Sequence, residues 1–254
     1  MDRLDAAALS IPGVRVRVVE RCGSTNTALL EEKSADCVLL AAEQQTAGRG
    51  RRGRRWHSAP GAGLTFSLAL QVRRPVRELA GLSLVAGVAV SKALRALGVA
   101  RAALKWPNDL VVDGAKLGGI LVETRSAGAA TRAVIGIGIN CRRDSSLGLR
   151  LRRKIASLDQ FLSPPPSRND LLKKITPMLL ESLDVFESKG LEPLRREWEA
   201  MSAYAGQRLR VRLADGRVLS GISDGIAEDG ALRLTTRNGI KTVRSGRVVS
   251  ARVA

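Results

Sequence analysis

The segment from Gly48 to Arg55, with the sequence GRGRRGRR, is the part of the chain best suited to bind an anion. Its five arginines carry planar guanidinium groups that can meet a carboxylate or a phosphate through two parallel hydrogen bonds. Its glycines allow the backbone to come close to a ligand. The residues alone leave two alternatives open, namely a site for a carboxylate and a triphosphate or a flexible basic loop that contacts nucleic acid.

Two well-known phosphate-binding devices fit this chain poorly. Gly48, Gly50 and Gly53 satisfy the pattern GxGxxG, but a dinucleotide-binding turn requires a helix to begin at once, whereas the pattern predicts a loop from Trp56 to Gly63. The sequence also contains no GxxxxGK[ST] phosphate loop. If the protein binds ATP, the glycine–arginine segment is therefore the candidate.

A second polar cluster surrounds the Asp113-Gly114 pair, which is a strong signal for a tight hairpin. The sequence KWPNDL (105–110) precedes this turn, and KLGGI (116–120) follows it. Two lysines, an amide and a carboxylate exceed what a structural hairpin needs, and two adjacent glycines weaken a strand unless something approaches its backbone. We therefore favour a ligand site here over an exposed turn around a packed tryptophan.

The composition limits the class of protein. A formal net charge of +18 first suggests an anionic partner such as DNA or RNA. Lysines and arginines are concentrated only in segments 49–55 and 142–154, and those spread along the rest of the chain indicate a solvated basic surface. Three widely spaced cysteines predict reduced thiols rather than disulfides or a metal site. The first residues, MDRLDAAALS, lack the basic region and apolar run of a signal peptide, and no stretch approaches roughly 18 consecutive apolar residues, so we expect a soluble, cytoplasmic protein that does not bind membranes.

The hydrophobic periodicity predicts an α+β fold in which helices flank a mixed, partly antiparallel sheet. In Leu64–Val72, for example, every second residue from Leu64 is apolar, as in a half-buried strand. After Gly206, short strands alternate with Asp-Gly and Asn-Gly turns, which is typical of a small β-barrel. We expect two domains, residues 1–204 and 205–254. The expected strands are 14–19, 38–42, 64–72, 110–112, 116–123 and 132–139, and the expected helices are 27–33, 79–97, 169–188 and 191–201.

Five motifs in this order resemble the biotin–protein ligases: STN (24–26), QxAGRGRRGRxW (45–56), KWPNDL (105–110), KLGGIL (116–121) and GIGIN (136–140). The resemblance implies a catalytic domain like that of class II synthetases with a small SH3-like barrel at the C-terminus. It includes no N-terminal helix-turn-helix domain, because only 23 residues precede Ser24, so we expect no sequence-specific DNA binding.

The resemblance also implies the roles of individual residues. Lys116 is expected to reach the biotin carboxylate and, with Arg49 and Arg51, to stabilise charge that develops in catalysis. Trp56 is expected to stack on adenine. The implied biotin-binding residues are Ser24, Thr25, Asn26, Gln45, Gly48, Arg49, Gly50, Arg51, Lys116, Gly118 and Gly119. The implied ATP-binding residues are Arg51, Arg54, Trp56, Lys105, Asn108, Asp109 and Asn140.

The implied reaction is ATP-dependent and forms AMP. Biotin attacks ATP with Mg²⁺ present, and the biotinyl-5'-AMP then passes biotin to a lysine of a biotin carboxyl carrier protein of acetyl-CoA carboxylase or a related acyl-CoA carboxylase. The metal is expected on the ATP phosphates, its protein ligands being unspecified. His57, the only histidine, has no evident nucleophile beside it, so no covalent enzyme intermediate is expected. The sequence leaves the oligomeric state open between a monomer and a weak homodimer.

Two other functions remain possible from the sequence. Lipoyl and octanoyl transferases resemble biotin ligases in the fold of the catalytic domain and also acylate a carrier lysine. The GRGRRGR and KWPNDL motifs in the form present here favour biotin. A basic nucleic-acid-binding module, supported by the charge of +18 and the small barrel, is the alternative outside enzymes.

Overall fold

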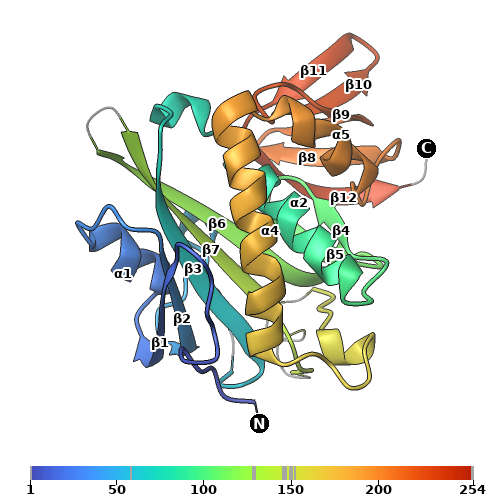
Figure 1. Cartoon of the computed structure of the whole chain (residues 1–254). Coiled ribbons are helices and arrows are strands. Elements are labelled where there is room, and N and C mark those ends of the chain that lie inside the picture. Colours follow the sequence, from blue (N-terminus) through green and yellow to red (C-terminus); the bar gives the residue numbers. More distant parts are fainter. Residues whose placement is uncertain are drawn as a thin grey trace.

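Seven strands form the larger of two sheets in the computed structural model, which describes residues 2–57, 59–127, 130–144, 148, 151 and 153–252. The strand order is β1-β2-β3-β7-β6-β5-β4 (Figure 1). β1 and β2 pair in parallel and the other neighbours pair antiparallel, so the sheet is mixed. The strands are β1 (Arg15–Cys22), β2 (Val38–Gln45), β3 (Gly63–Val72), β4 (Ala103–Lys105), β5 (Asp109–Val112), β6 (Ala115–Ala127) and β7 (Ala130–Asn140).

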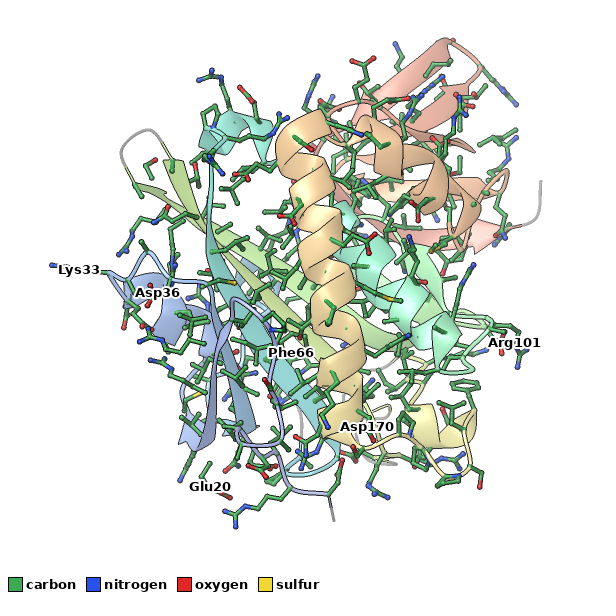
Figure 2. All side chains as sticks on the ribbon, viewed as in Figure 1. Glu20, Lys33, Asp36, Phe66, Arg101 and Asp170 are labelled. Carbon is green, nitrogen blue, oxygen red and sulfur yellow. The ribbon has the colours of Figure 1, made fainter. Side chains whose placement is uncertain are left out.

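Helices cover both faces of this sheet. Leu64, Phe66 and Leu68 of β3 belong to the main core together with helices α2 (Leu82–Ala96) and α4 (Arg168–Lys189). On the opposite face, Leu29 of α1 (Thr25–Glu31) packs in a smaller apolar cluster with strand residues. Figure 2 shows the side chains that fill these layers, with Phe66 inside and charged residues such as Arg101 at the periphery. The sheet is therefore buried on both faces where β3 passes through it.

The smaller sheet lies at the C-terminal end and is antiparallel, in the order β11-β10-β9-β8-β12. It contacts the rest of the molecule through α5 (Glu192–Ala200), because the Glu199 carboxylate accepts a hydrogen bond from the Ile226 amide at 3.1 Å. The Trp106 indole also donates to the carbonyl of Gly230 at 3.1 Å. Its strands are β8 (Arg208–Leu213), β9 (Val218–Ile226), β10 (Leu232–Thr236), β11 (Gly239–Val243) and β12 (Gly246–Arg252).

These observations confirm the predicted α+β fold class, and the differences lie mainly at element ends. The first helix begins at Thr25 rather than Thr27, so Thr25 and Asn26 lie in its first turn and only Ser24 occupies the N-cap position. The expected helix 79–97 begins at Leu82, after a short 3₁₀ turn, η2 (Val76–Glu78). Two further 3₁₀ turns are η1 (Arg51–Gly53) and η3 (Leu158–Gln160). Part of the basic segment 142–154 lies outside the described residues.

None of the helices in the described ranges combines the length and the apolar character that crossing a bilayer requires.

Candidate active site

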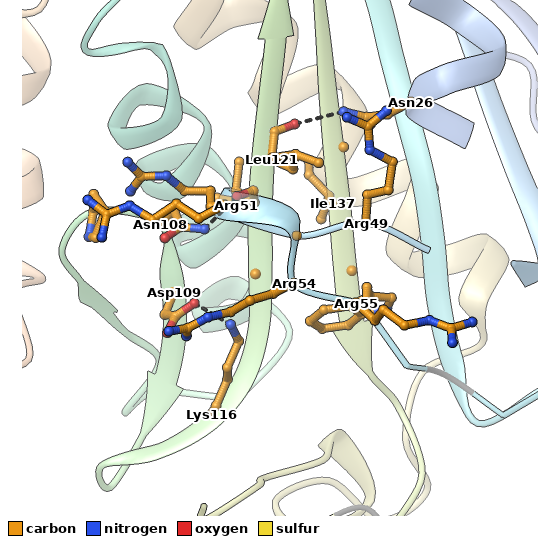
Figure 3. Close-up of a pocket in the computed structure, with 18 of the residues that line it drawn as sticks. Asn26, Arg49, Arg51, Arg54, Arg55, Asn108, Asp109, Lys116, Leu121 and Ile137 are labelled. Carbon is orange, nitrogen blue, oxygen red and sulfur yellow. Dashed lines mark hydrogen bonds and ion pairs between the residues drawn. The ribbon is translucent and has the colours of Figure 1, made fainter. Parts of the chain in front are cut away.

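The glycine–arginine loop, residues 48–56, crosses strands β6 and β7 and covers a cavity above the middle of the larger sheet (Figure 3). The N-terminus of α1 and the end of β2 border one end of this cavity, and the β5–β6 hairpin borders the other. Most of the residues predicted from the sequence to form the site line it: Ser24, Thr25, Asn26, Gln45, Arg49, Gly50, Arg51, Arg54, Trp56, Lys105, Asn108, Asp109, Lys116 and Gly119.

Hydroxyl and amide groups form the end of the cavity beside α1. The Gln45 side-chain oxygen accepts hydrogen bonds from the Thr25 amide at 2.8 Å and from the Thr25 hydroxyl at 3.2 Å. The Ser24 side chain makes no helix-capping hydrogen bond although Ser24 is only 6% exposed. This end therefore presents neutral hydrogen-bonding groups in a buried setting, which suits a polar but uncharged part of a ligand.

Asn26 is held in place by the protein at both ends of its amide. Its nitrogen donates to the Leu121 carbonyl at 3.1 Å and to the Glu123 carboxylate at 3.0 Å, and its oxygen accepts from Ser67 at 2.6 Å. A Cβ at Gly136 would lie 2.1 Å from that oxygen, so glycine is required there for the amide to fit. Asn26 thus fixes the position of the first turn of α1 against β6 and β7.

The opposite end of the cavity is strongly cationic. Over the whole cavity, nine of the described lining side chains are lysine or arginine and the single carboxylate is that of Asp109, which lies at this end with Lys116 and Lys105. The Lys116 ammonium forms an ion pair with Asp109 (Figure 3). Burial lowers the pKa of Lys116 below that of an ordinary lysine despite this partner, and burial also lowers the pKa of Lys105. Uncompensated buried positive charge is stabilised when an anion enters.

Trp56 lines the cavity with its ring against β7. Its ring packs so closely on β7 that a Cβ at Gly138 would lie 2.4 Å from it, and a Cβ at Gly119 would lie 3.4 Å from the same ring. The Lys116 ammonium lies 5.8 Å from the ring centroid. The Trp56 indole nitrogen is buried without a hydrogen-bond partner, so it is a donor that a ligand could satisfy.

Residues 18–140 match the model of the Biotin/lipoate A/B protein ligase family, and the bifunctional ligase/repressor BirA of Escherichia coli (strain K12) is 36% identical over 250 residues, covering 94% of this chain and 74% of that protein. The chain belongs to the biotin/lipoate A/B protein ligase family. Residues 204–249 further match the biotin protein ligase C-terminal domain, in agreement with the predicted small SH3-like unit.

Other relatives within the family agree. The biotin–[acetyl-CoA-carboxylase] ligase of Mycobacterium tuberculosis (strain H37Rv) is 35% identical, covering 92% of this chain and 88% of that protein. The biotin protein ligase of Aquifex aeolicus, solved in complex with biotin and ATP, superimposes with a TM-score of 0.81 at 29% identity, covering 94% of this chain and 99% of that chain. The family's fold is therefore shared over nearly the whole chain.

Three residues predicted for the ligase site do not line its cavity, and each has a visible structural role. A Cβ at Gly118 would lie 2.6 Å from the Gly138 carbonyl oxygen, so this glycine permits strand packing, and a Cβ at Gly48 would lie 2.7 Å from the Trp56 carbonyl oxygen. The Asn140 amide donates to the Lys116 carbonyl at 3.2 Å and to the Ala156 carbonyl at 3.0 Å. Asn140 therefore holds the backbone that carries Lys116.

Several residues that contribute to this ligase cavity were not predicted from the sequence. Arg153 and Arg247 line it, Arg247 coming from β12 of the smaller sheet. Arg153 belongs to the basic segment 142–154, whose concentrated charge was a signal for anion binding. Nothing in the sequence connects Arg247 with the distant loop 48–56. Ser67 bonds to both Thr25, at 2.7 Å, and Asn26.

The cysteines of this ligase-family member are not placed to act as nucleophiles in the cavity. Cys22, Cys37 and Cys141 are unpaired, and none of them lines the cavity. Burial raises the pKa of Cys141 to about 12, so that thiol stays protonated and unreactive near neutral pH. His57 also lies outside the residues that line the cavity.

No cluster of three or more histidine, cysteine or acidic side chains suited to a metal ion occurs within the described part of the chain. Asp109 is the one carboxylate that lines the described wall of the cavity. A single protein carboxylate fits a Mg²⁺ ion that is carried mainly by the phosphate oxygens of a nucleotide.

Proposed function

We propose that this chain activates biotin with ATP to form biotinyl-5'-AMP and then transfers biotin to a lysine of a biotin carboxyl carrier protein. The observation that carries this proposal is the cavity itself, which joins a hydroxyl–amide end to an end where cationic side chains far outnumber the single carboxylate of Asp109. Such a cavity suits a ligand with an uncharged polar ring system, a carboxylate, and a phosphate partner. The names of the relatives, several of which are biotin ligases, support the same conclusion.

Biotin's ureido group is proposed to occupy the end beside α1. Its candidate partners are the hydroxyls of Ser24 and Thr25 and the side-chain nitrogen of Gln45. Thr25 engages only the side-chain oxygen of Gln45, so the nitrogen can bond to a ligand. Asn26 acts there as a positioning residue, since protein groups engage both ends of its amide. Gly50 lets the loop backbone approach the ligand, as Gly48 and Gly118 let the surrounding strands and loop pack.

For the first step, the biotin carboxylate oxygen attacks the α-phosphorus of ATP, and the bond to the bridging oxygen breaks as pyrophosphate leaves. Lys116 would counter the negative charge that develops around the α-phosphate, after Asp109 yields part of its ion pair to the ligand. Arg49 and Arg51 would hold the carboxylate and the phosphates in line, although Arg49 must first release Glu123, its partner at 2.7 Å.

For the nucleotide, Trp56 supplies a flat ring for adenine, and the cationic end supplies charge for the phosphates. The proposed ATP-binding residues are Arg51, Arg54, Trp56, Lys105, Asn108, Asp109 and Asn140, the last acting through the Lys116 backbone. Mg²⁺ would be held by Asp109 and the ATP phosphates, where it neutralises phosphate charge.

In the second step, the neutral amine of the carrier lysine attacks the carbonyl carbon of the mixed anhydride, AMP leaves, and the amine loses a proton to solvent. The loop over the cavity would exclude water until the lysine arrives. We assign catalysis to residues 1–204 and a supporting role to residues 205–254. We also propose a cytoplasmic location, where the carrier proteins of acyl-CoA carboxylases would be available.

The test is ATP–pyrophosphate exchange that depends on biotin and Mg²⁺, followed by transfer of labelled biotin to an apo carrier domain. Exchange with biotin but not with lipoate or octanoate is the expected result. Exchange without added biotin, or no exchange with saturating biotin, would contradict the proposal, and exchange only with lipoate or octanoate would assign the chain to the other branch of the family.

A further inference from the structure

The solvent-exposed face of the smaller sheet carries five arginines on two neighbouring strands. Only one of them, Arg247, lines the cavity, and the proposed reaction gives the other four no role. Arg208, Arg210 and Arg212 alternate along β8 with buried or half-buried apolar residues, so their side chains share the solvent face. On β12, Arg247 lies directly opposite Arg212, and Arg252 lies opposite Arg208. All five are exposed. We call this set the arginine face.

The arginine face lacks negative partners within the described chain. The ion pairs in this sheet involve other arginines: Arg217 pairs with Asp215, and Arg233 pairs with Asp224. The neighbouring strand β9 places Val218, Ser220 and Ile222 beside β8, none of which is acidic. Like charges directly opposite each other across a sheet oppose folding, so the free protein carries an electrostatic cost here that an acidic partner would relieve.

The arginine face reaches the mouth of the active-site cavity. Arg247 belongs to both, and burial together with repulsion from Arg54, Arg212 and Arg52 lowers its pKa. The loop is joined to the same edge, because Arg52 donates to the Ser245 hydroxyl at 2.8 Å. A macromolecule bound to the arginine face would therefore lie next to the opening through which an acceptor lysine must enter.

We propose that the arginine face is the docking surface for an acidic patch on the carrier domain that receives biotin. The proposal rests on the proposed transfer reaction. A carrier held along β8 and β12 is close to the cavity mouth, and the positive field also speeds its approach. A nucleic acid held there would cover the entrance to the cavity, so the geometry favours the protein substrate.

The test compares two double charge reversals in the full chain. Arg208→Glu with Arg210→Glu removes charge from the arginine face but leaves Arg212 and Arg247 in place, because Arg247 lines the cavity. Arg237→Glu with Lys241→Glu is the matched control, since it changes the net charge equally in the β10–β11 hairpin, at the opposite edge of the sheet. Each protein is assayed for biotin-dependent pyrophosphate exchange, for hydroxylamine capture of the adenylate, and for transfer to a purified apo biotin carboxyl carrier domain of acidic net charge.

We expect the arginine-face variant to lose about tenfold or more in kcat/KM for the carrier at low ionic strength, and to show a weaker dependence on salt. Exchange and hydroxylamine capture should stay at wild-type rates, because neither requires docking. The control pair should transfer to the carrier within about twofold of wild type, since rim charges away from the contact contribute little. If the reversal impairs folding, Arg208→Gln with Arg210→Gln should show a smaller loss in the same direction.

Carrier transfer unchanged in both arginine-face variants, with normal exchange, would overturn the docking proposal. Loss of binding to a labelled DNA or RNA duplex, with carrier transfer intact, would overturn it in favour of a nucleic-acid surface. An equal loss in the control pair would also overturn it, by showing a general effect of net charge. Failure of exchange in the wild-type protein would instead contradict the proposed function.

Discussion

The hydroxyl of Ser67, on β3, donates to the side-chain oxygen of Asn26, on α1, across 2.6 Å. Both residues are nearly inaccessible to solvent, at 0% and 3% exposure. The bond ties the first turn of α1, and with it Ser24 and Thr25, to the centre of the larger sheet. The geometry of the proposed biotin end therefore depends on a residue that need not contact biotin.

Ser67→Ala should raise the KM for biotin by roughly tenfold, equivalent to about 1.4 kcal/mol, because Asn26 loses a buried donor and the α1 turn loosens. The free energy of unfolding should fall by about 1–3 kcal/mol. Ser91→Ala is the matched control, since Ser91 is equally buried and bonds to the Ala102 carbonyl on the far side of the sheet. It should lower stability without changing the KM for biotin. Equal KM values for biotin in both variants would show that Ser67 does not position the biotin site.

This bond also marks the limit of what the sequence could reveal. The alternation of Leu64, Phe66 and Leu68 correctly predicted a strand with one apolar face, and that pattern suggested that Thr65 and Ser67 face solvent. The structure buries both, at 3% and 0% exposure, because a second layer covers that face. Polar residues at alternate strand positions look the same in sequence whether water or a binding site faces them, so periodicity alone could not decide.

Functional residues that lie within one short motif could be predicted from the sequence, whereas those brought to the site by long-range packing could not. The loop 48–56 and the 105–120 hairpin were predictable because each places several functional residue types within one short segment. Arg247 was not, since its position at the cavity depends on how the smaller sheet packs on α5 and Trp106. The role of Asn140 likewise depends on a hydrogen bond from β7 to the Lys116 carbonyl on the neighbouring strand β6, a contact that no motif in the sequence announces.

Lys116→Ala should slow biotinyl-adenylate formation by an amount corresponding to about 3 kcal/mol, while weakening ATP binding much less. The reason is that the ammonium acts where charge develops rather than on adenine. Single-turnover adenylate formation and equilibrium ATP binding are the two measurements. A wild-type single-turnover rate would place Lys116 outside the chemistry.

The pH dependence gives a second test of Lys116. Because burial lowers its pKa below the ordinary value of 10.5, the charged form is lost at a lower pH than for an exposed lysine. Exchange activity should therefore decline as pH rises toward and through that lowered pKa. In Lys116→Arg the alkaline decline should disappear, because arginine keeps its charge. Lys105→Arg is the control, and disappearance of the decline in that variant alone would assign it to Lys105.

Gly138→Ala should raise the KM for ATP by roughly tenfold or more, with a smaller effect on biotin. A Cβ at this position would lie 2.4 Å from the Trp56 ring, so the ring must leave its place on β7. Gly23→Ala provides the same substitution where no atom lies within 4 Å of the added Cβ, and it should leave both constants near wild type. An unchanged KM for ATP in Gly138→Ala, with normal folding, would exclude Trp56 as the adenine surface.

Ligands should order the loop 48–56. Apart from Trp56, its side chains make mostly exposed contacts: Arg49 pairs with Glu123 and Arg52 bonds to Ser245. Arg52 also occupies a left-handed backbone conformation with φ of 56°. Arginines that repel one another favour opening, and burial together with neighbouring Arg52 lowers the pKa of Arg51.

A carboxylate and phosphates supply the missing counter-charge, so binding should shift the loop toward the closed form. Tryptic cleavage and amide exchange at Arg51–Arg55 should therefore slow by about tenfold or more with a saturating, stable biotinyl-adenylate analogue, since protection follows the open population. Cleavage at exposed Arg237, in the distant β10–β11 turn, is the internal control and should not change. If cleavage at Arg51–Arg55 proceeds equally with and without the analogue, this loop does not close over the site, and the exclusion of water from the mixed anhydride must come from another segment.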